Sequence, residues 1–237
     1  MRDALIFNGA SNLDFQEIRA NVVRIPEVIQ RIRMAQKIWD SVAVTPLDLA
    51  NFVGSEDEVF LSHIKLKSFA TAVVQVGLLD RYLKNHSLPE YVVGAINGDS
   101  PMRFAIGELS FEELVATSSA VVSSRPRVPT AAVTNALELP VLAGVQLVEY
   151  AVYRRTTDAT FERVFSDTRE VERMVVDLVD AQDVNKLLMV GPGSAVSGKK
   201  ILDLTSRDVQ VLESIDLDPM LSWFWPNLKG SRLAIAN

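Results

Sequence analysis

The sequence predicts an α/β protein with a mainly parallel sheet flanked by helices. Short runs of apolar and β-branched residues alternate with longer segments of helical period, which is the order expected for parallel strands joined by helices. In addition, the apolar strand Tyr91–Val93 leads into Gly94 and Gly98, four residues apart, and then into a predicted helix. This strand–turn–helix order is typical of the sharp turn that presents a nucleophilic serine above a sheet. Here Ile96 holds the serine's position.

The elements are predicted from period, capping residues and turn residues. The predicted strands are Ala4–Phe7, Tyr91–Val93, Val141–Val148, Leu187–Val190 and Val209–Ile215. The predicted helices are Phe15–Trp39 with Pro26 at a start or kink, one starting at Ser55-Glu56-Asp57-Glu58, Lys67–Leu83, Asp99–Ile106, one from Ser110 to near Ser124, Thr157–Phe165 and Arg169–Ala181. No repeat or low-complexity segment interrupts them, and the length alone allows one large domain or two small ones.

The composition narrows the function classes. A hydrophobic content of 48% in 237 residues indicates a globular core. No apolar run approaches the roughly 20 residues of a membrane helix, and the N-terminus does not resemble a signal peptide. The absence of cysteine excludes disulfides and thiolate metal sites, and a net charge of −6 argues against a general nucleic-acid binder. We therefore expect a cytoplasmic protein without a membrane or nucleic-acid partner, a metal or a cofactor.

Several motifs, in order and spacing, resemble the malonyl-CoA:acyl-carrier-protein transacylases, the acyltransferases of fatty-acid and polyketide synthesis. Leu5–Asn12 is similar to the family's opening strand and loop, and Gly54–Val59 is similar to its G-x-E-D-E-L. Gly94–Asp99 takes the place of its elbow. Gly107–Glu113 is similar to its G-A-L-S-F-E-D, and Val190–Gly193 to its V-G-P-G. The resemblance implies an acyltransferase, α/β-hydrolase-like core that forms a single domain over residues 1–237. It also implies that the family's small inserted subdomain is largely missing, because only about residues 124–139 occupy its place.

The family's catalytic residues do not carry over to this chain. Its elbow is G-H-S-L-G-E, whereas the matching residues here are Gly94, Ala95, Ile96, Asn97, Gly98 and Asp99. The arginine that would pair with a malonyl carboxylate falls on Val121, and the loop glutamine has no counterpart. The family's general-base histidine belongs to the second half of the chain, but both histidines here, His63 and His86, lie in the first half. Without an activated nucleophile, a base and oxyanion donors, acyl transfer is not expected.

A shifted alignment keeps an enzyme alternative open. Sliding Gly98-Asp99-Ser100 onto the G-x-S motif restores a serine, but it places Met102 at the second elbow glycine and supplies no downstream histidine. Ser11 is a second displaced serine, and His63 is the first replacement base to consider. We interpret His63 as a surface or capping residue and His86 as a loop residue.

Two further features suit a partner protein, although each also has a structural interpretation. Basic residues gather in three short clusters, which are solvated surface or a docking site for an acidic carrier protein: Arg125, Arg127, Arg154, Arg155, Lys199 and Lys200. Trp223 and Trp225 lie in an aromatic segment that suits core packing or an interface.

The leading hypothesis is a catalytically inactive acyltransferase-like protein, a binding or scaffolding accessory in polyketide or fatty-acid biosynthesis. It would contact an acyl carrier protein or another synthase subunit. The alternative is an atypical malonyl- or acyl-CoA transacylase, or an acyl-thioester hydrolase, that uses a displaced serine.

Overall fold

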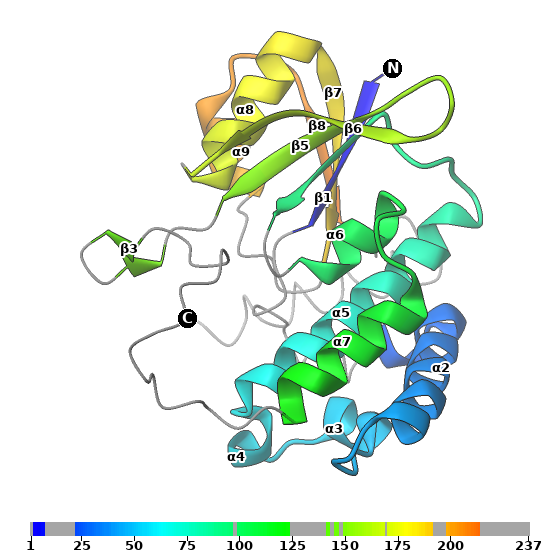
Figure 1. Cartoon of the computed structure of the whole chain (residues 1–237). Helices are drawn as coiled ribbons and strands as arrows, with labels where there is room; N and C mark the ends of the chain where they lie inside the picture. Colours follow the sequence, from blue (N-terminus) through cyan, green and yellow to red (C-terminus); the bar gives the residue numbers. More distant parts are fainter. Residues whose placement is uncertain are drawn as a thin grey trace, which may run out of the picture.

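The computed structural model describes residues 2–7, 22–96, 99–123, 141–142, 145–146, 149–168, 170–191 and 198–213. A six-stranded sheet lies at its centre (Figure 1). In the order β6-β5-β2-β1-β7-β8, its strands are Phe161–Asp167, Tyr150–Arg155, Tyr91–Ala95, Arg2–Phe7, Val184–Val190 and Gln210–Glu213. A separate pair consists of β3 (Val141–Leu142) and β4 (Val145–Gln146).

The middle of the large sheet is parallel. Strand β1 pairs in parallel with β2 on one side and β7 on the other, and β7 pairs in parallel with β8. The predicted strands at the start of the chain, before the elbow and near Val190 are therefore confirmed as neighbours in one sheet. Because they are parallel, their carboxyl ends at Phe7, Ala95 and Val190 meet at one edge. Ligands of open α/β sheets bind at that edge.

Helices cover both faces of the sheet. One group comprises η1 (Val22–Arg24), α2 (Pro26–Val42), α3 (Leu49–Gly54), α4 (Glu58–Leu61), α5 (Ile64–Leu83), α6 (Ser100–Ala105) and α7 (Phe111–Ser123). The other comprises α8 (Val171–Gln182) and α9 (Gly198–Leu204). Side chains of β1 alternate between these groups: Leu5 and Phe7 join the core under the first, and Ala4 and Ile6 join the core under the second.

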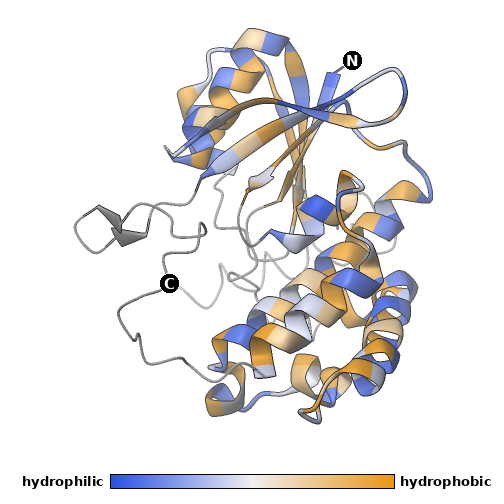
Figure 2. Cartoon of the chain, in the orientation of Figure 1, coloured by the Kyte–Doolittle hydropathy of each residue, from blue (hydrophilic) through white to orange (hydrophobic). Residues whose placement is uncertain are grey.

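The hydropathy pattern agrees with this layering. Figure 2 shows hydrophobic residues along the central strands and a mixture of polar and hydrophobic residues on the helices. Helix α5 differs from the other helices because its middle and second half are almost fully buried, between the sheet and α2. No helix in the described part of the chain is both long and apolar enough to cross a membrane.

Helices α2 and α5 approach closely and are joined by charged side chains. A Cβ atom on Gly77 of α5 would lie 2.6 Å from the Val28 Cα of α2, so glycine lets the two backbones touch. Arg31 donates to Asp80 through Nε at 2.5 Å and Nη2 at 3.0 Å. Its guanidinium also stacks over Phe111, 4.5 Å from the ring centroid. The arginine thereby ties α2 to both α5 and α7.

The predicted helix Thr157–Phe165 is wrong. Residues Tyr150–Arg155 and Phe161–Asp167 form an antiparallel hairpin, β5–β6, that extends the sheet beyond β2. The turn is closed by hydrogen bonds between Thr156 and Thr160, including one from the Thr156 amide to the Thr160 carbonyl at 2.8 Å. Ala159 in this turn adopts a φ of 59°, an unfavourable conformation for alanine. The antiparallel pairing of β6 with β5 outweighed the local helical pattern.

Two other boundaries also differ from the sequence prediction. The expected strand Val141–Val148 is divided into the short antiparallel strands β3 and β4. The expected helix Phe15–Trp39 begins at Pro26 as an α-helix, preceded by the short η1, and residues 15–21 lie outside the described ranges. Proline at the first helical position needs no amide hydrogen bond, which explains why the helix starts there. The shortened insert at 124–139 also lies outside those ranges and stays a prediction.

Candidate functional site

The elbow lies at the carboxyl edge of the sheet, between β2 and α6. Ile96 follows Ala95, the last residue of β2, and occupies a turn. Its amide donates to the Glu149 carbonyl at 2.9 Å, and its side chain packs against the core beneath the helices. The structure thus places Ile96 at the strand-to-helix turn, where the sequence predicted it. An isoleucine side chain has no lone pair with which to attack an acyl group.

Glycine at position 94 is required by packing. A Cβ atom there would lie 2.6 Å from Met102 Cγ, 2.8 Å from Met102 Cβ and 3.0 Å from Asp99 Oδ2. These distances are far below ordinary van der Waals contact, so α6 can lie this close to β2 only over a glycine. Met102 itself is fully buried inside α6. Met102 therefore lies within a helix. The shifted alignment on Ser100 would instead place it at the tight turn, in the position of the second elbow glycine.

A buried carboxylate, Asp99, holds the turn together. Its Oδ1 accepts from the Met102 amide at 3.3 Å, which caps α6, and its Oδ2 accepts from the Ala95 amide at 3.4 Å. The residue has no solvent exposure. Sequence reasoning missed this role, although aspartate just before Ser100 and Pro101 is a typical helix start. Ser100 is the first residue of α6 and is half-buried.

Tyr150 is a second residue at the elbow that sequence reasoning did not single out. It pairs with Ala95 across β2 and β5. Burial raises the pKa of the Tyr150 phenol, and the carboxylates of Asp99 and Glu172 raise it further. The phenol is therefore protonated at neutral pH. No cluster of three or more potential metal ligands occurs in the described ranges.

Both histidines have structural positions. His63 is the N-cap of α5, where its Nδ1 accepts from the Leu66 amide at 3.4 Å. Gln75 of the same helix donates to the carbonyl of Val190, the last residue of β7, at 3.2 Å. The contact of Gln75 marks where α5 passes the carboxyl edge of the sheet, at the end of β7. His63 lies twelve residues before Gln75, about 18 Å away along the helix. His86 stacks on Tyr82, with ring centroids 4.6 Å apart.

The position matched to the family's arginine is on α7. Val121 is 51% exposed. Its backbone carbonyl accepts from the Lys65 ammonium at 2.8 Å, which joins the end of α7 to the start of α5.

Of the four predicted partner contacts that the structure describes, two make ion pairs. Arg154 contacts Glu90, with 3.3 Å between nitrogen and oxygen, and Lys200 contacts Glu170 at 2.6 Å. Arg155 and Lys199 lie on β5 and α9. The remaining calls lie outside the described residues: Ser11, Asn97, Gly98, Arg125, Arg127, Trp223 and Trp225.

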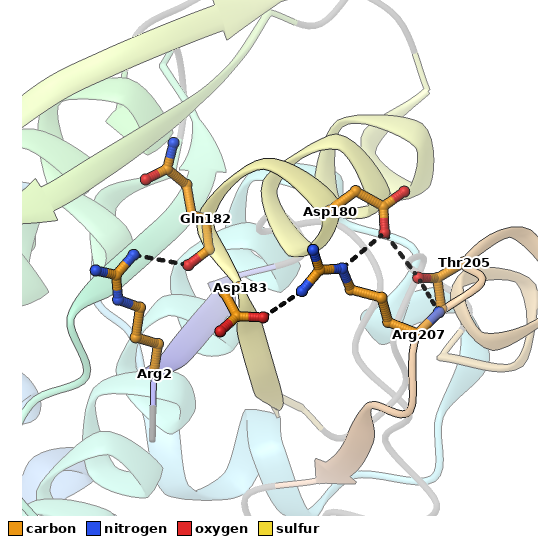
Figure 3. Close-up of polar contacts among 6 residues, drawn as sticks. All are labelled: Arg2, Asp180, Gln182, Asp183, Thr205 and Arg207. Atoms are coloured by element: carbon orange, nitrogen blue, oxygen red, sulfur yellow. Dashed lines mark hydrogen bonds and ion pairs between the residues drawn. The ribbon is translucent and has the colours of Figure 1, made fainter.

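A polar cluster at the amino edge of the sheet has a structural role. Figure 3 shows Arg207 between Asp180 and Asp183, and Arg2 donating to the Gln182 carbonyl. Asp183 has a φ of 57° and joins α8 to β7. These contacts close the α8–β7 turn at the edge opposite the elbow, and ion pairs this exposed contribute little stability.

Comparisons with solved structures identify the fold. The malonyl-CoA:ACP transacylase of Synechocystis sp. PCC 6803 matches with a TM-score of 0.57 at 13% identity, over 90% of this chain and 97% of that chain. The transacylase of Clostridium perfringens ATCC 13124 matches with a TM-score of 0.55 at 11% identity, over 100% of both chains. The chain has the fold of the malonyl-CoA:acyl-carrier-protein transacylases. No protein-family model and no curated protein sequence matches it.

A third structure with the transacylase fold contains a type II PKS acyl-carrier protein in complex with its malonyl-transacylase. It matches at 12% identity with a TM-score of 0.43, over 90% of this chain and 96% of that chain. The fold assignment rests on the two structures with higher scores. At these identities the similarity concerns the backbone, and the chemistry must be argued from the residues at the elbow.

Proposed function

We propose that this protein is a non-catalytic member of the transacylase fold that acts as a binding or scaffolding accessory in polyketide or fatty-acid biosynthesis. Its partner would be an acyl carrier protein or another synthase subunit. The observation that supports the proposal is an elbow whose shape is held by Gly94, Met102 and Asp99 while Ile96 occupies the nucleophile's position.

The positions of the other groups favour the same proposal. A serine in this turn would need a base to take its proton. His63 is committed to capping α5, and His86 is stacked on Tyr82. The Tyr150 phenol has a raised pKa and is a poor base because it is protonated at neutral pH. The Asp99 carboxylate in the turn already accepts from the backbone amides of Ala95 and Met102, so it too has a structural role.

Single-turnover labelling with radiolabelled malonyl-CoA tests the absence of chemistry, because it detects one acyl transfer without requiring release. The protein, the Ile96→Ser variant and the Synechocystis transacylase as positive control are incubated at neutral pH and precipitated. We expect label on the positive control alone, since Ile96→Ser restores a hydroxyl without a base. Circular dichroism must show that the variant is folded.

Two outcomes would contradict the proposal. Label on the unmodified protein that disappears in Ser100→Ala would favour the displaced-serine enzyme. Rapid label on Ile96→Ser would reveal a hidden base, and adding His63→Ala would then test the first suspect. The binding half of the proposal is measured separately, by calorimetric titration with acyl carrier protein.

A further inference from the structure

Helix α2 presents an open groove on the face turned away from the core. Its buried residues include Val28, Ile32, Ala35 and Trp39. On another face, an open groove of about 590 Å³ is lined by Pro26, Ile29, Gln30, Arg33, Met34 and Lys37. Their spacing of three and four residues places them in one stripe about 16 Å long. Figure 1 shows α2 at the edge of the helical layer, away from α6 and the elbow.

This stripe, which we call the α2 groove, combines apolar and cationic side chains. Ile29 and Met34 are half-buried, and Arg33 and Lys37 are exposed one helical turn apart. Neither cation makes a hydrogen bond or ion pair with another described residue. By contrast, the cations that join α2 to the α5 region are paired with carboxylates. Arg31 pairs with Asp80, and Arg81 and Lys84 pair with Glu27.

In the described part of the chain, the carboxylates next to Arg33 and Lys37 line a different groove, on the other side of these two residues. A second groove of about 360 Å³ shares these two cations and also contains Asp40 and Asp48. Both carboxylates are engaged, Asp40 with the Gln36 amide at 2.7 Å and Asp48 with the Asn51 backbone amide at 2.9 Å. Among the residues that the structure describes, the α2 groove is lined by two cations and no anion. The charge difference between the two grooves gives a bound partner a preferred side.

We infer that the α2 groove is a docking site for an acidic amphipathic helix of a partner protein. Apolar side chains of that helix would contact Ile29 and Met34, and its acidic flank would pair with Arg33 and Lys37. Because the whole chain carries a net charge of −6, an acidic partner is attracted here by a local cationic feature rather than by the overall charge. The inference deepens the proposed function and rests on it for the identity of the partner, an acidic carrier protein.

A designed peptide tests the groove without any carrier protein. The probe is a fluorescein-labelled helical peptide about 16 residues long, with leucine along one face and glutamate along both flanks. A control peptide has lysine at every glutamate position. Fluorescence anisotropy at low and high salt is expected to show binding of the acidic peptide alone, weakened by salt. Equal binding of both peptides, or no binding of the acidic one, would overturn the inference.

Charge reversal locates the site on the full-length protein. The double variant Arg33→Glu, Lys37→Glu is expected to bind the acidic peptide about tenfold more weakly and to gain binding of the lysine peptide. This gain separates lost docking from lost folding. The matched control Arg163→Glu, Arg173→Glu makes the same change in net charge at exposed positions of β6 and α8 and should leave peptide binding unchanged. If the control weakens binding as much as the α2 variant does, the site is not on α2.

Titration with acyl carrier protein then separates this inference from the proposed function. If the carrier binds and Arg33→Glu, Lys37→Glu abolishes that binding, both stand. If the acidic peptide binds but the carrier does not, the groove stands and the proposed partner fails. If the carrier binds the unmodified protein and the Arg33→Glu, Lys37→Glu variant equally, the proposed partner stands and the groove is refuted. Sedimentation should give one molecular mass for the protein and the α2 variant; a dimer lost in the variant would instead make a second copy the occupant.

Discussion

The substitution Gly94→Ala tests how the elbow is built. The added methyl group would lie 2.6 Å from Met102 Cγ and 3.0 Å from Asp99 Oδ2. Forcing an extra carbon into a packed core costs about 1–3 kcal/mol, while replacing glycine recovers about 0.4–1 kcal/mol by restricting the unfolded chain. We therefore expect the free energy of unfolding to fall by about 1–2 kcal/mol. Helix α6 must shift away from β2 to accept the methyl group.

Two companion variants isolate the cause. Gly54→Ala adds the same methyl group where no heavy atom lies within 4 Å, so it should be neutral or slightly stabilising. Met102→Ala alone should cost about 2–5 kcal/mol because it leaves a cavity. In the double variant the alanine at 94 occupies part of that space. The double variant should therefore lose less stability than the two single variants lose together, by about 1 kcal/mol or more.

Urea unfolding followed by far-ultraviolet circular dichroism measures the unmodified protein and the four variants, with the midpoint and the slope fitted together. Equal stability of Gly94→Ala and the unmodified protein would refute the close approach of α6 and β2. Strict additivity of the Gly94 and Met102 substitutions would do so as well. Either result would remove the packing explanation for the elbow glycine.

Three further substitutions probe the scaffold. Gly77→Ala should cost about 1–3 kcal/mol in urea unfolding, because its methyl group would meet the Val28 backbone at 2.6 Å and helices must separate. For Glu27, burial raises the pKa, but the hydrogen bond from Lys84 and neighbouring positive charges outweigh burial and leave the pKa below 4.5. Its stabilising effect is therefore present above pH 4.5 and is lost as the pH falls below that value, so Glu27→Gln should flatten the acid limb of a stability–pH curve. Ala159→Gly should stabilise the protein by about 1 kcal/mol and so raise the thermal midpoint, because Ala159 has a φ of 59°, which glycine adopts without strain.

The sequence predicted the central strands well because their environment is simple. Tyr91–Val93 and Leu187–Val190 are buried on both faces, so a short apolar run sufficed to identify each of them. The β5–β6 hairpin was missed because β6 has no buried residue and shows no clear alternation. Its strand conformation comes from pairing with β5 and from the turn at Thr156–Thr160. Such non-local pairing cannot be read from local propensity.

The candidate site was predictable in its backbone and less so in its side chains. The glycine spacing located the turn at Ile96, and the histidine count limited the chemistry. The contribution of Asp99 was missed because the resemblance presents it as a conservative replacement of a family glutamate. Its burial and its two backbone hydrogen bonds become visible only in three dimensions. Tyr150 was missed for the same reason, since only the β2–β5 register brings it next to Ala95.

These observations separate two properties that a motif combines. Gly94 is explained by contact with Met102 and Asp99, a requirement of shape that holds whether or not acyl transfer occurs. Residue 96 packs against the same core, and it is the position at which chemistry would enter. A glycine-rich elbow is therefore evidence for close packing of strand and helix, and evidence for catalysis must come from the residue between the glycines and from a base within reach. By that criterion the elbow of this protein has the first property, and single-turnover labelling of the protein and of Ile96→Ser tests the second.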